Sequence, residues 1–238
     1  MAPPQASEAT TRLRARIYID GFNFYYAAYR EGAFGAFKWL DIVAFGEALF
    51  PKYGIDHVRY FTAKVKSPPS DPDQSSRQDA YLRALAAHPR VSIHFGAFTR
   101  HQVTMQRVNP PRRGPRGVLV WKVEEKGSDV NLASWLVADA FRDLFDVAVV
   151  VSDDSDLLEP VRIVKDELGK TVVVARVPRY RAAPAGSATK RRKALRASVF
   201  KDKVDFIREV REHHFRRSQL PNPVVRADGT QITKPSAW

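Results

Sequence analysis

The sequence contains no cysteine among its 238 residues. A disulfide, a zinc site built on thiolates and a cysteine nucleophile are therefore excluded, and a reducing compartment is permitted. Long hydrophobic runs are also missing, since no stretch approaches the roughly 20 apolar residues that a membrane-spanning helix needs. The N-terminal stretch MAPPQASEATTRLRAR lacks the apolar core of a signal peptide. We therefore expect a soluble, cytoplasmic protein with no membrane partner.

Several motifs of nucleotide binding and catalysis are absent as well. No GxGxxG follows the first predicted strand, and neither a P-loop nor a GxSxG nucleophile elbow occurs. A phosphoaspartyl hydrolase would need a second acid two residues after Asp20, and that position is Phe22. The six histidines are scattered, and the pair His213–His214 is predicted to lie on a solvated helix face. These classes of enzyme are therefore disfavoured.

Positive charge is present in excess. Lysine and arginine total 39 against 26 acidic residues, which gives a formal net charge of +13. Such an excess favours a polyanionic partner, most often nucleic acid, although solubility alone is the alternative explanation. Hydrophobic residues make up 44% and aromatic residues 11%, as is typical of a globular chain. The length suffices for one sizeable domain with tails.

Predicted strands alternate with predicted helices along most of the chain. The apolar stretch Val147–Val151 is nearly all valine, which is typical of a central parallel strand buried on both faces. The alternation predicts an α/β fold with a parallel, doubly wound sheet between helices. Strands are expected at residues 15–20, 57–63, 91–98, 147–151 and 171–175, and helices at residues 39–53, 77–88, 127–144 and 157–168.

The chain is predicted to divide into four segments. Residues 1–14 form a flexible leader and residues 15–176 the α/β domain, within which 99–122 is an excursion with hairpin strands around a Pro- and Arg-rich loop. Residues 177–203 form a basic loop. Residues 204–238 comprise a last helix, Val204–Phe215, and a Pro-rich tail. A monomer and a homo-oligomer are both compatible with this pattern.

Acidic residues gather where predicted strands end. The strand ARIYID ends in Asp20, and the valine-rich strand is followed by Asp153, Asp154 and Asp156. In open parallel sheets, ligands bind outside the carboxyl ends of the strands, where neighbouring strands would bring these acids together. Asp129 lies near the start of the helix at residues 127–144 and shares its predicted buried face.

Each of these acids also has a purely structural explanation. Ser128 or Asp129 could cap its helix, Asp153 or Ser155 could cap the next one, and Asp20 could belong to a turn. A cap needs one acid rather than three, so we favour a cation site. Hard oxygen ligands without cysteine or a histidine cluster predict Mg²⁺ or Mn²⁺. The cation would join the carboxylates to phosphates that basic flanks attract.

Three segments together resemble the signature blocks of NYN domains, which are PIN-like nucleases related to bacterial proteins of the LabA group. The blocks are IYIDGFNFYYA, EEKGSDVNLASWLVADA and VVVSDDSDLLEPVRIVKDELGKTVVV, and the similarity covers about Arg16 to Ala175. The resemblance implies a three-layer α/β/α sandwich with a mostly parallel central sheet, and metal-dependent RNA cleavage. By position it implies catalytic and metal-binding roles for Asp20, Asp129, Asp154 and Asp156.

Supporting roles follow from the same resemblance. Asn23 and Ser152 are implied as polar neighbours of the metal, and Glu125 and Lys126 belong to the second block. The family usually has glycine where this chain has Asp153. An extra carboxylate there would add a ligand or shift the backbone.

We therefore predict a Mg²⁺- or Mn²⁺-dependent ribonuclease that hydrolyses RNA phosphodiester bonds. The alternative is a non-catalytic RNA-binding adaptor with a degenerate site. Tyr25, Tyr26 and Tyr29 are predicted to pack in the core with Phe34 and Phe37, the alternative being base stacking. The RNA, single-stranded or structured, is expected to contact two basic stretches, which contain Arg112, Arg113, Arg116, Lys190, Arg191, Arg192 and Lys193.

Overall fold

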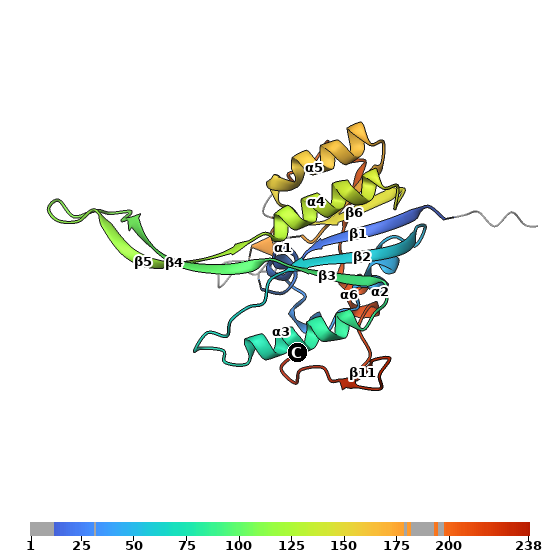
Figure 1. The fold of residues 1–238 in the computed structure, drawn as a ribbon, viewed down its shortest axis with the longest axis horizontal. Helices are drawn as coiled ribbons and strands as arrows, with labels where there is room; N and C mark the ends of the chain where they lie inside the picture. Colours follow the sequence, from blue (N-terminus) through green and yellow to red (C-terminus); the bar gives the residue numbers. More distant parts are fainter. Residues whose placement is uncertain (1–11, 31, 179, 182–192, 195–197) are drawn as a thin grey trace, which may run out of the picture.

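A six-stranded sheet forms the centre of the protein. The computed structural model describes residues 12–30, 32–178, 180–181, 193–194 and 198–238. All neighbouring strands of the sheet run parallel, in the order β10-β7-β6-β1-β2-β3. Helices cover both faces, so the predicted α/β fold is confirmed (Figure 1). In sheet order the strands are β10 (Phe206–Glu209), β7 (Thr171–Arg176), β6 (Val147–Val151), β1 (Arg14–Asp20), β2 (Gly54–Thr62) and β3 (Val91–Phe95).

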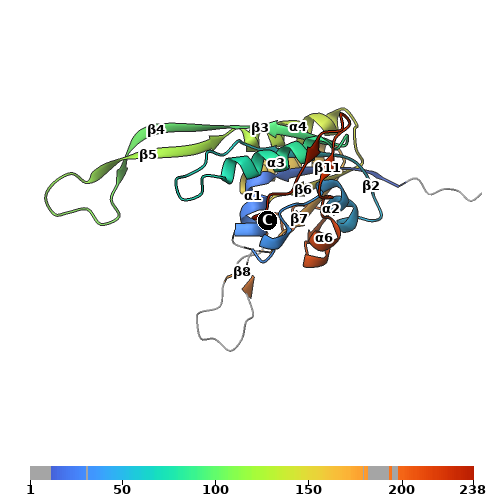
Figure 2. The ribbon, with the colours of Figure 1, turned by 90° about the horizontal axis from the view of Figure 1, so that it is seen from below.

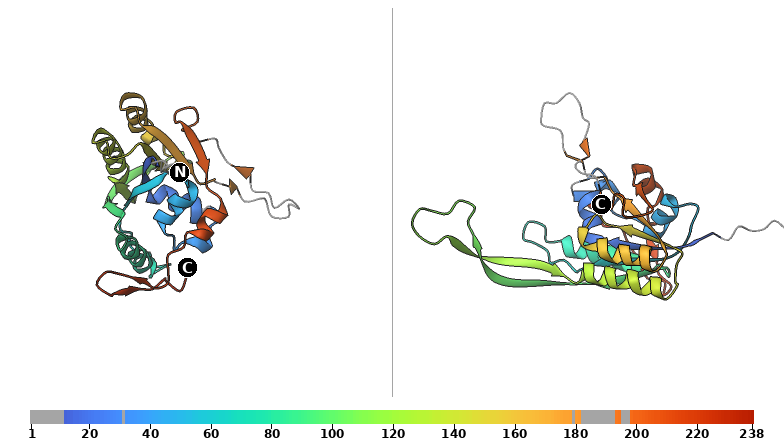
Figure 3. Two further views of the ribbon diagram at one scale, coloured as in Figure 1. Left: turned by 90° about the vertical axis from the view of Figure 1, so that its right-hand side faces the viewer. Right: turned by 90° about the horizontal axis from the view of Figure 1, so that it is seen from above.

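The alternating side chains of the central strands supply two separate cores. Tyr18 of β1 packs into one core, and its neighbours Ile17 and Ile19 pack into the other. All five residues of β6 are buried, as predicted for a central parallel strand. The first core lies under α4 (Ser128–Phe141) and the continuous pair α5 (Leu158–Arg162) and η4 (Ile163–Glu167), which lie side by side (Figures 1 and 3).

The helices of the opposite face pack a large aromatic core. Phe215 lies at its centre, stacked on Phe34 with ring centroids 4.4 Å apart. Trp39 is fully buried in the same core. The elements on this side are α1 (Gly21–Tyr25), η1 (Tyr26–Arg30), η2 (Gly35–Phe37), α2 (Ile42–Leu49), α3 (Gln74–Ala86) and α6 (Glu212–Arg217).

A long two-stranded ribbon projects from the body (Figures 1 and 2). Its antiparallel strands, β4 (Ala97–Gln106) and β5 (Gly117–Lys126), pair continuously from Ala97–Lys126 out to Gln106–Gly117. We call residues 97–126 the arm. The arm is longer at both ends than the predicted excursion of residues 99–122. Arg112, Arg113 and Arg116 lie exposed at its tip.

The predicted helix Val204–Phe215 is wrong over its first half. Residues 206–209 form the edge strand β10, and only Glu212–Arg217 is helical. Val204, Ile207 and Val210 have helical spacing, but Val204 lies in a bend, Ile207 in a strand and Val210 in the connection that follows. The edge of β7 offers this segment a parallel ladder, in which Phe206 to Glu209 pair with Val173 to Arg176. The Val210 N–H extends the ladder by donating to the Arg176 carbonyl at 2.8 Å.

His214 also differs from its predicted position on a solvated face. Its ring is buried, and its Nδ1 accepts a hydrogen bond from the Arg211 N–H at 2.9 Å. The tail beyond it packs on the body: Trp39 Nε1 donates to the Pro221 carbonyl at 3.0 Å. Two small antiparallel pairs complete the fold: β8 (Tyr180–Arg181) with β9 (Lys193–Ala194), and β11 (Val224–Val225) with β12 (Gln231–Ile232).

Part of the predicted basic loop lies outside the described residues, including Lys190, Arg191 and Arg192. Lys193 belongs to β9. Within the part of the chain that is described, none of the helices combines the length and the apolar character required to traverse a bilayer.

A buried carboxylate ties α4 to the sheet. The Asp139 side chain has 0% exposure, and it accepts hydrogen bonds from Arg59 Nε at 2.7 Å, the Tyr18 hydroxyl at 2.9 Å and Arg16 Nη1 at 3.2 Å. Burial alone would raise the pKa of Asp139, but these donors outweigh it and hold the pKa below the ordinary value. Because Arg16 and Tyr18 lie on β1 and Arg59 on β2, the carboxylate fixes the helix over both strands.

We expect Asp139→Ala to lower the free energy of unfolding by about 3–5 kcal/mol, because it leaves buried donors without their acceptor. The measurement is urea denaturation. Asp79→Ala is the matched control: its pair with Arg83 is exposed, and its loss should cost less than about 1 kcal/mol. Because the folded-state pKa of Asp139 is depressed, its stabilisation is present above the ordinary pKa of about 3.9 and disappears as pH falls through the folded value. Equal losses in both variants would contradict the role given to Asp139.

Candidate metal centre

Asp20 and Ser152 adjoin at the carboxyl edge of the sheet. β1 and β6 pair in register up to Ile19 and Val151, so the next residue of each strand emerges beside the other. Asp20 Oδ2 accepts a hydrogen bond from Ser152 Oγ at 2.9 Å, and its Oδ1 accepts one from the Asn23 N–H at 3.0 Å. Asp20 therefore caps α1 while its carboxylate faces the end of β6.

The three aspartates after β6 take three different positions. Asp154 caps the short helix η3 (Ser155–Leu157), since its Oδ1 accepts from the Asp156 N–H at 3.0 Å. The alternative explanation, in which Asp153 or Ser155 caps this helix, therefore does not hold. Asp153 turns away: its Oδ1 accepts from Ser198 Oγ at 2.6 Å, and Arg176 Nε lies 3.7 Å from its Oδ2. The side chain of Asp156 is exposed.

Asp129 is positioned by the sharp connection from β5 to α4. Gly127 makes this turn with φ of +98°, a left-handed conformation that favours glycine. Glu125 supports the turn, because its Oε1 accepts from Ser128 Oγ at 2.8 Å and from the Ser128 N–H at 3.2 Å. Gly96 lets this carboxylate approach, since a Cβ there would lie 2.0 Å from Glu125 Oε1. Glu125 thus orients the start of α4, and Lys126 is exposed beside it.

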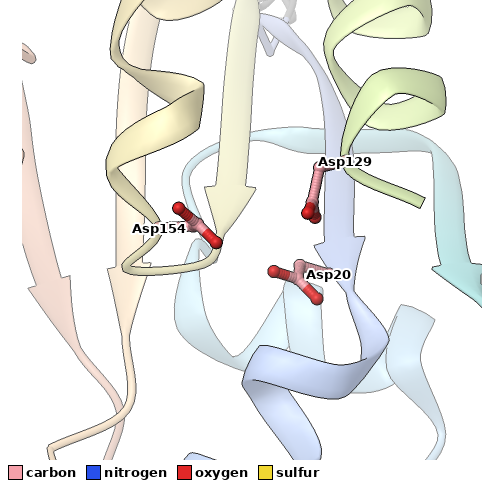
Figure 4. Close-up of side chains that lie close together, drawn as sticks. All are labelled: Asp20, Asp129 and Asp154. Carbon is pink, nitrogen blue, oxygen red and sulfur yellow. The ribbon is translucent and has the colours of Figure 1, made fainter. Parts of the chain in front are cut away.

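Three carboxylates from three elements face one another (Figure 4). Asp20, Asp129 and Asp154 each offer an oxygen within 4.8 Å of the others. Four residues were predicted as ligands, and the structure brings these three together while Asp156 lies outside the group. Because the donors are all carboxylate oxygens, the group fits a hard divalent cation such as Mg²⁺ or Mn²⁺. We call these three residues the acidic group.

The carboxylates of the acidic group disfavour one another's ionisation. Burial, followed by the charges of Asp20 and Asp154, raises the pKa of Asp129 to about 6. Burial also raises the pKa of Asp20, although the hydrogen bonds from Asn23 and Ser152 oppose this effect. A bound cation would offset this repulsion, which makes the arrangement suited to binding one.

A neighbouring cavity could not be anticipated from the sequence. It adjoins the acidic group through Gly21 and Phe22, and it is also lined by Tyr60 and Gln74. These two residues come from β2 and α3, far along the chain from Asp20, and no local motif marks them. Only the parallel pairing of β1 with β2 brings Tyr60 next to the end of β1.

Comparison with known proteins identifies one family. The family model described as the NYN domain matches residues 14–201. A curated relative, 6-hydroxy-3-succinoylpyridine 3-monooxygenase HspA of Pseudomonas putida, is 33% identical over 177 residues, which are 64% of this chain and 56% of that protein. The chain therefore matches just over half of the relative's length. A crystal structure of a Vibrio parahaemolyticus protein of unknown function covers 90% of this chain and 100% of that one, with a TM-score of 0.49 and 14% identity.

We expect Asp129→Asn to stabilise the metal-free protein at pH values well above 6. The folded-state pKa of about 6 exceeds the ordinary value of about 3.9, so Asp129 stabilises the fold only when protonated, and this contribution is lost as pH rises through 6. After allowance for solvent screening at this partly exposed group, the gain should be about 1 kcal/mol.

Thermal unfolding in EDTA and in excess MnCl₂ measures this effect and its reversal. Manganese should raise the melting temperature of the wild type, and it should raise that of Asp129→Asn by less, because one ligand charge is gone. Asp79→Asn, an exposed acid on α3, should behave like the wild type in both buffers. A wild-type melting temperature that ignores manganese would argue against cation binding.

Proposed function

Because the chain belongs to the NYN domain family, we propose that it is a metal-dependent ribonuclease that hydrolyses the phosphodiester bonds of RNA. NYN domains are of nuclease type and generally act on nucleic acids. The observation that carries the proposal is the acidic group, whose carboxylate oxygens lie within 4.8 Å of one another at the carboxyl edge of a parallel sheet. The net charge of +13 supports a polyanionic substrate.

Each residue of the site has a defined task in this proposal. Asp20, Asp129 and Asp154 would hold Mg²⁺ or Mn²⁺, which when bound supplies a Lewis acid for the scissile phosphate and lowers the pKa of a bound water. Ser152 and Asn23 hold the Asp20 carboxylate in place through hydrogen bonds of 2.9 and 3.0 Å. Glu125 fixes the first turn of α4 and, with it, Asp129. A role for Asp156 rests on the sequence resemblance alone.

The monooxygenase activity in the name of the Pseudomonas relative is attributed to that protein, of which this chain matches 56%. The acidic group favours phosphate chemistry instead, because carboxylate-held divalent cations suit phosphoryl oxygens. The remaining alternative is an RNA-binding adaptor whose acidic group does not support cleavage. A cleavage assay separates it from the nuclease.

We expect the purified protein to cleave labelled RNA when Mn²⁺ is present and not in EDTA. Asp20→Asn and Asp154→Asn should each lower the cleavage rate by more than the roughly 10–100-fold typical of residues that only orient ligands. RNA binding should be retained or become slightly tighter, because each change removes negative charge near the phosphates. Undiminished cleavage by both variants would rule out the assignment.

Two further variants sharpen this assay. Asp79→Asn removes an exposed acid outside the site and should cleave like the wild type. Asp156→Asn decides between three and four acidic ligands, because its side chain is exposed and outside the acidic group. We expect it to retain most of the activity. An RNA that binds but stays intact in all conditions would favour the adaptor.

The arm supports RNA binding beside the acidic group. It carries seven lysine and arginine residues against two glutamates, and β5 ends three residues before Asp129. At its base, Phe98 packs edge-on against Phe22, with ring centroids 5.7 Å apart. Further out, the Arg100 guanidinium lies 4.2 Å from the centre of the Trp121 ring. Such pairs of arginine and aromatic residues suit single-stranded nucleic acid.

We expect the combined change of Arg112, Arg113 and Arg116 to Ala to weaken the salt dependence of RNA binding. Each lost phosphate contact on a single strand reduces the slope of log affinity against log salt by about 0.7, so the slope should flatten by up to about 2. Fluorescence anisotropy at several salt concentrations measures it. Phosphate contacts by Lys190 to Lys193 remain a prediction of the same kind.

The control replaces three other exposed arginines, Arg142, Arg162 and Arg226, which lie off the arm. Net charge then changes equally in both triple variants. If the two slopes flatten by the same amount, the arm makes no phosphate contacts of its own, and only the overall charge matters.

A further inference from the structure

A cavity of about 470 Å³ lies next to the acidic group, between η1, β2 and α3. Its wall begins at Gly21, the residue after Asp20. Gly21 sits so close to Tyr60 that a Cβ there would lie 2.9 Å from the Tyr60 hydroxyl. The volume is in the range of about 300–1,000 Å³ that small-ligand sites occupy. A molecule in the cavity would therefore lie directly beside whatever the acidic group holds.

The lining combines aromatic rings with a few polar and basic groups. The aromatic residues of the wall are Phe22, Phe24, Tyr25, Tyr26, Tyr29, Tyr60, Tyr81 and Trp238, and its polar residues include Arg30, Lys38, Gln74 and the ion pair of Arg77 with Asp71. Rings of this kind stack on planar ligands, and arginine and lysine attract phosphates. The wall thus matches a planar heterocycle that carries a phosphate.

One buried polar atom indicates that the cavity is built for a ligand. The Tyr29 hydroxyl is buried and finds no hydrogen-bond partner among the described residues. An unpaired buried hydroxyl is costly for a fold, and because Tyr29 lines the cavity, a polar ligand group that reaches the hydroxyl would pair with it. Burial also raises the pKa of Tyr29, so the hydroxyl stays protonated and can donate.

The aromatic residues near Asp20 divide into two sets. Phe34 and Phe37 stack on Phe215 with ring centroids 4.4 and 6.3 Å apart, and they belong to the core, as predicted. Tyr25 and Tyr26 line the cavity instead. Phe22 and Phe24 also line the cavity, so the tyrosines share its wall with two phenylalanines.

Tyr26 is placed to cover a ligand. Its side chain is 38% exposed. The Arg30 guanidinium lies 5.2 Å from the centre of its ring, and Arg30 Nη1 donates to its hydroxyl at 3.3 Å. Arg30 thereby orients the Tyr26 ring and adds positive charge beside it. Gln74, whose amide offers both a donor and an acceptor, lies in the same wall and can pair with the edge of a ring.

We propose that this cavity binds a nucleobase of the RNA whose phosphate lies at the acidic group. The proposal rests on the proposed function and adds a base-binding site to it. The aromatic wall stacks on the base, Gln74 and Tyr29 pair with its polar edge, and Arg30 and Lys38 attract the adjoining phosphates. The protein would then grip the nucleotide beside the scissile bond through its base as well as its backbone.

The test compares two probes of equal charge in calcium buffer, so that binding is read by anisotropy without manganese-supported cleavage. One is a fluorescent uridine oligonucleotide of about four nucleotides, near the lower end of single-strand site sizes. The other is a ribose-phosphate chain of the same length with no bases. Tyr26→Ala should weaken binding of the uridine probe about 10-fold, in line with one lost stacking contact. It should leave the base-free probe unchanged.

Three further variants make the result specific. Tyr26→Phe keeps the stacking ring but loses the hydrogen bond from Arg30, so it should weaken the uridine probe less than Tyr26→Ala does, whereas Gln74→Ala should weaken only the uridine probe. Phe141→Ala removes an aromatic side chain with 80% exposure at the far end of α4 and should change neither probe. Matching melting temperatures verify that the variants are folded.

Equal weakening of both probes by Tyr26→Ala, or no weakening of either, would overturn the base-binding site. The ribonuclease would still stand in that case if the wild type cleaves RNA with Mn²⁺. Conversely, base-dependent binding without any cleavage would sustain the cavity and reject the nuclease.

Discussion

The parallel pairing of β1 with β6 determines where the site lies. Because Ile19 and Val151 are partners in the ladder, the chain must emerge from both strands at one point, and Asp20 meets the loop that carries Asp154. This proximity costs free energy, because like charges in a partly buried place repel. The hydrogen bonds from Ser152 and Asn23 to Asp20 offset part of that cost. The hydrogen-bonded ladder of β1 and β6 keeps the two strand ends together against the remaining repulsion.

The position of the third carboxylate, Asp129, depends on the buried charge of Asp139. Asp129 opens α4, and Asp139 lies ten residues later, about 15 Å away along the helix axis. At that end, the bonds from Arg16, Tyr18 and Arg59 hold the helix to β1 and β2. A buried ion pair seldom adds much stability compared with apolar packing. Here it fixes a helix in one register over two strands, so that the opposite end of the helix delivers Asp129 to the acidic group.

Much of this arrangement could be predicted from the sequence, because it follows from local pattern and sheet geometry. The apolar run at residues 147–151 identified a central strand, and strand-end acids identified Asp20 and Asp154. The pattern failed where distant partners decide. β10 forms because the edge of β7 offers it a ladder, and Asp153 turns away because Ser198 binds it. The spacing of Asp154 and Asp156 could not reveal that only one of them faces Asp20.

The cavity beside the site shows the same limit. Its tyrosines cluster in one short segment, but the residues opposite them come from β2 and α3, which the fold alone brings near. Aromatic composition therefore predicted packing in the core for Tyr25 and Tyr26 as well, whereas both line the cavity. Tyr26 differs from Phe34 and Phe37 by its exposure, and Tyr29 differs from them by its unpaired hydroxyl.

The ladder of the arm constrains how relatives of this protein can vary. β4 and β5 pair residue by residue, and side chains alternate between the two faces of the ribbon. Loss of a single residue pair would turn every side chain beyond it to the opposite face. Insertions and deletions that preserve those faces should therefore come in steps of two pairs and fall toward the tip. At the base, the close approach at Gly96 and the positive φ of Gly127 fix the turn into α4, so the reach of the arm can evolve separately from the chemistry at its root.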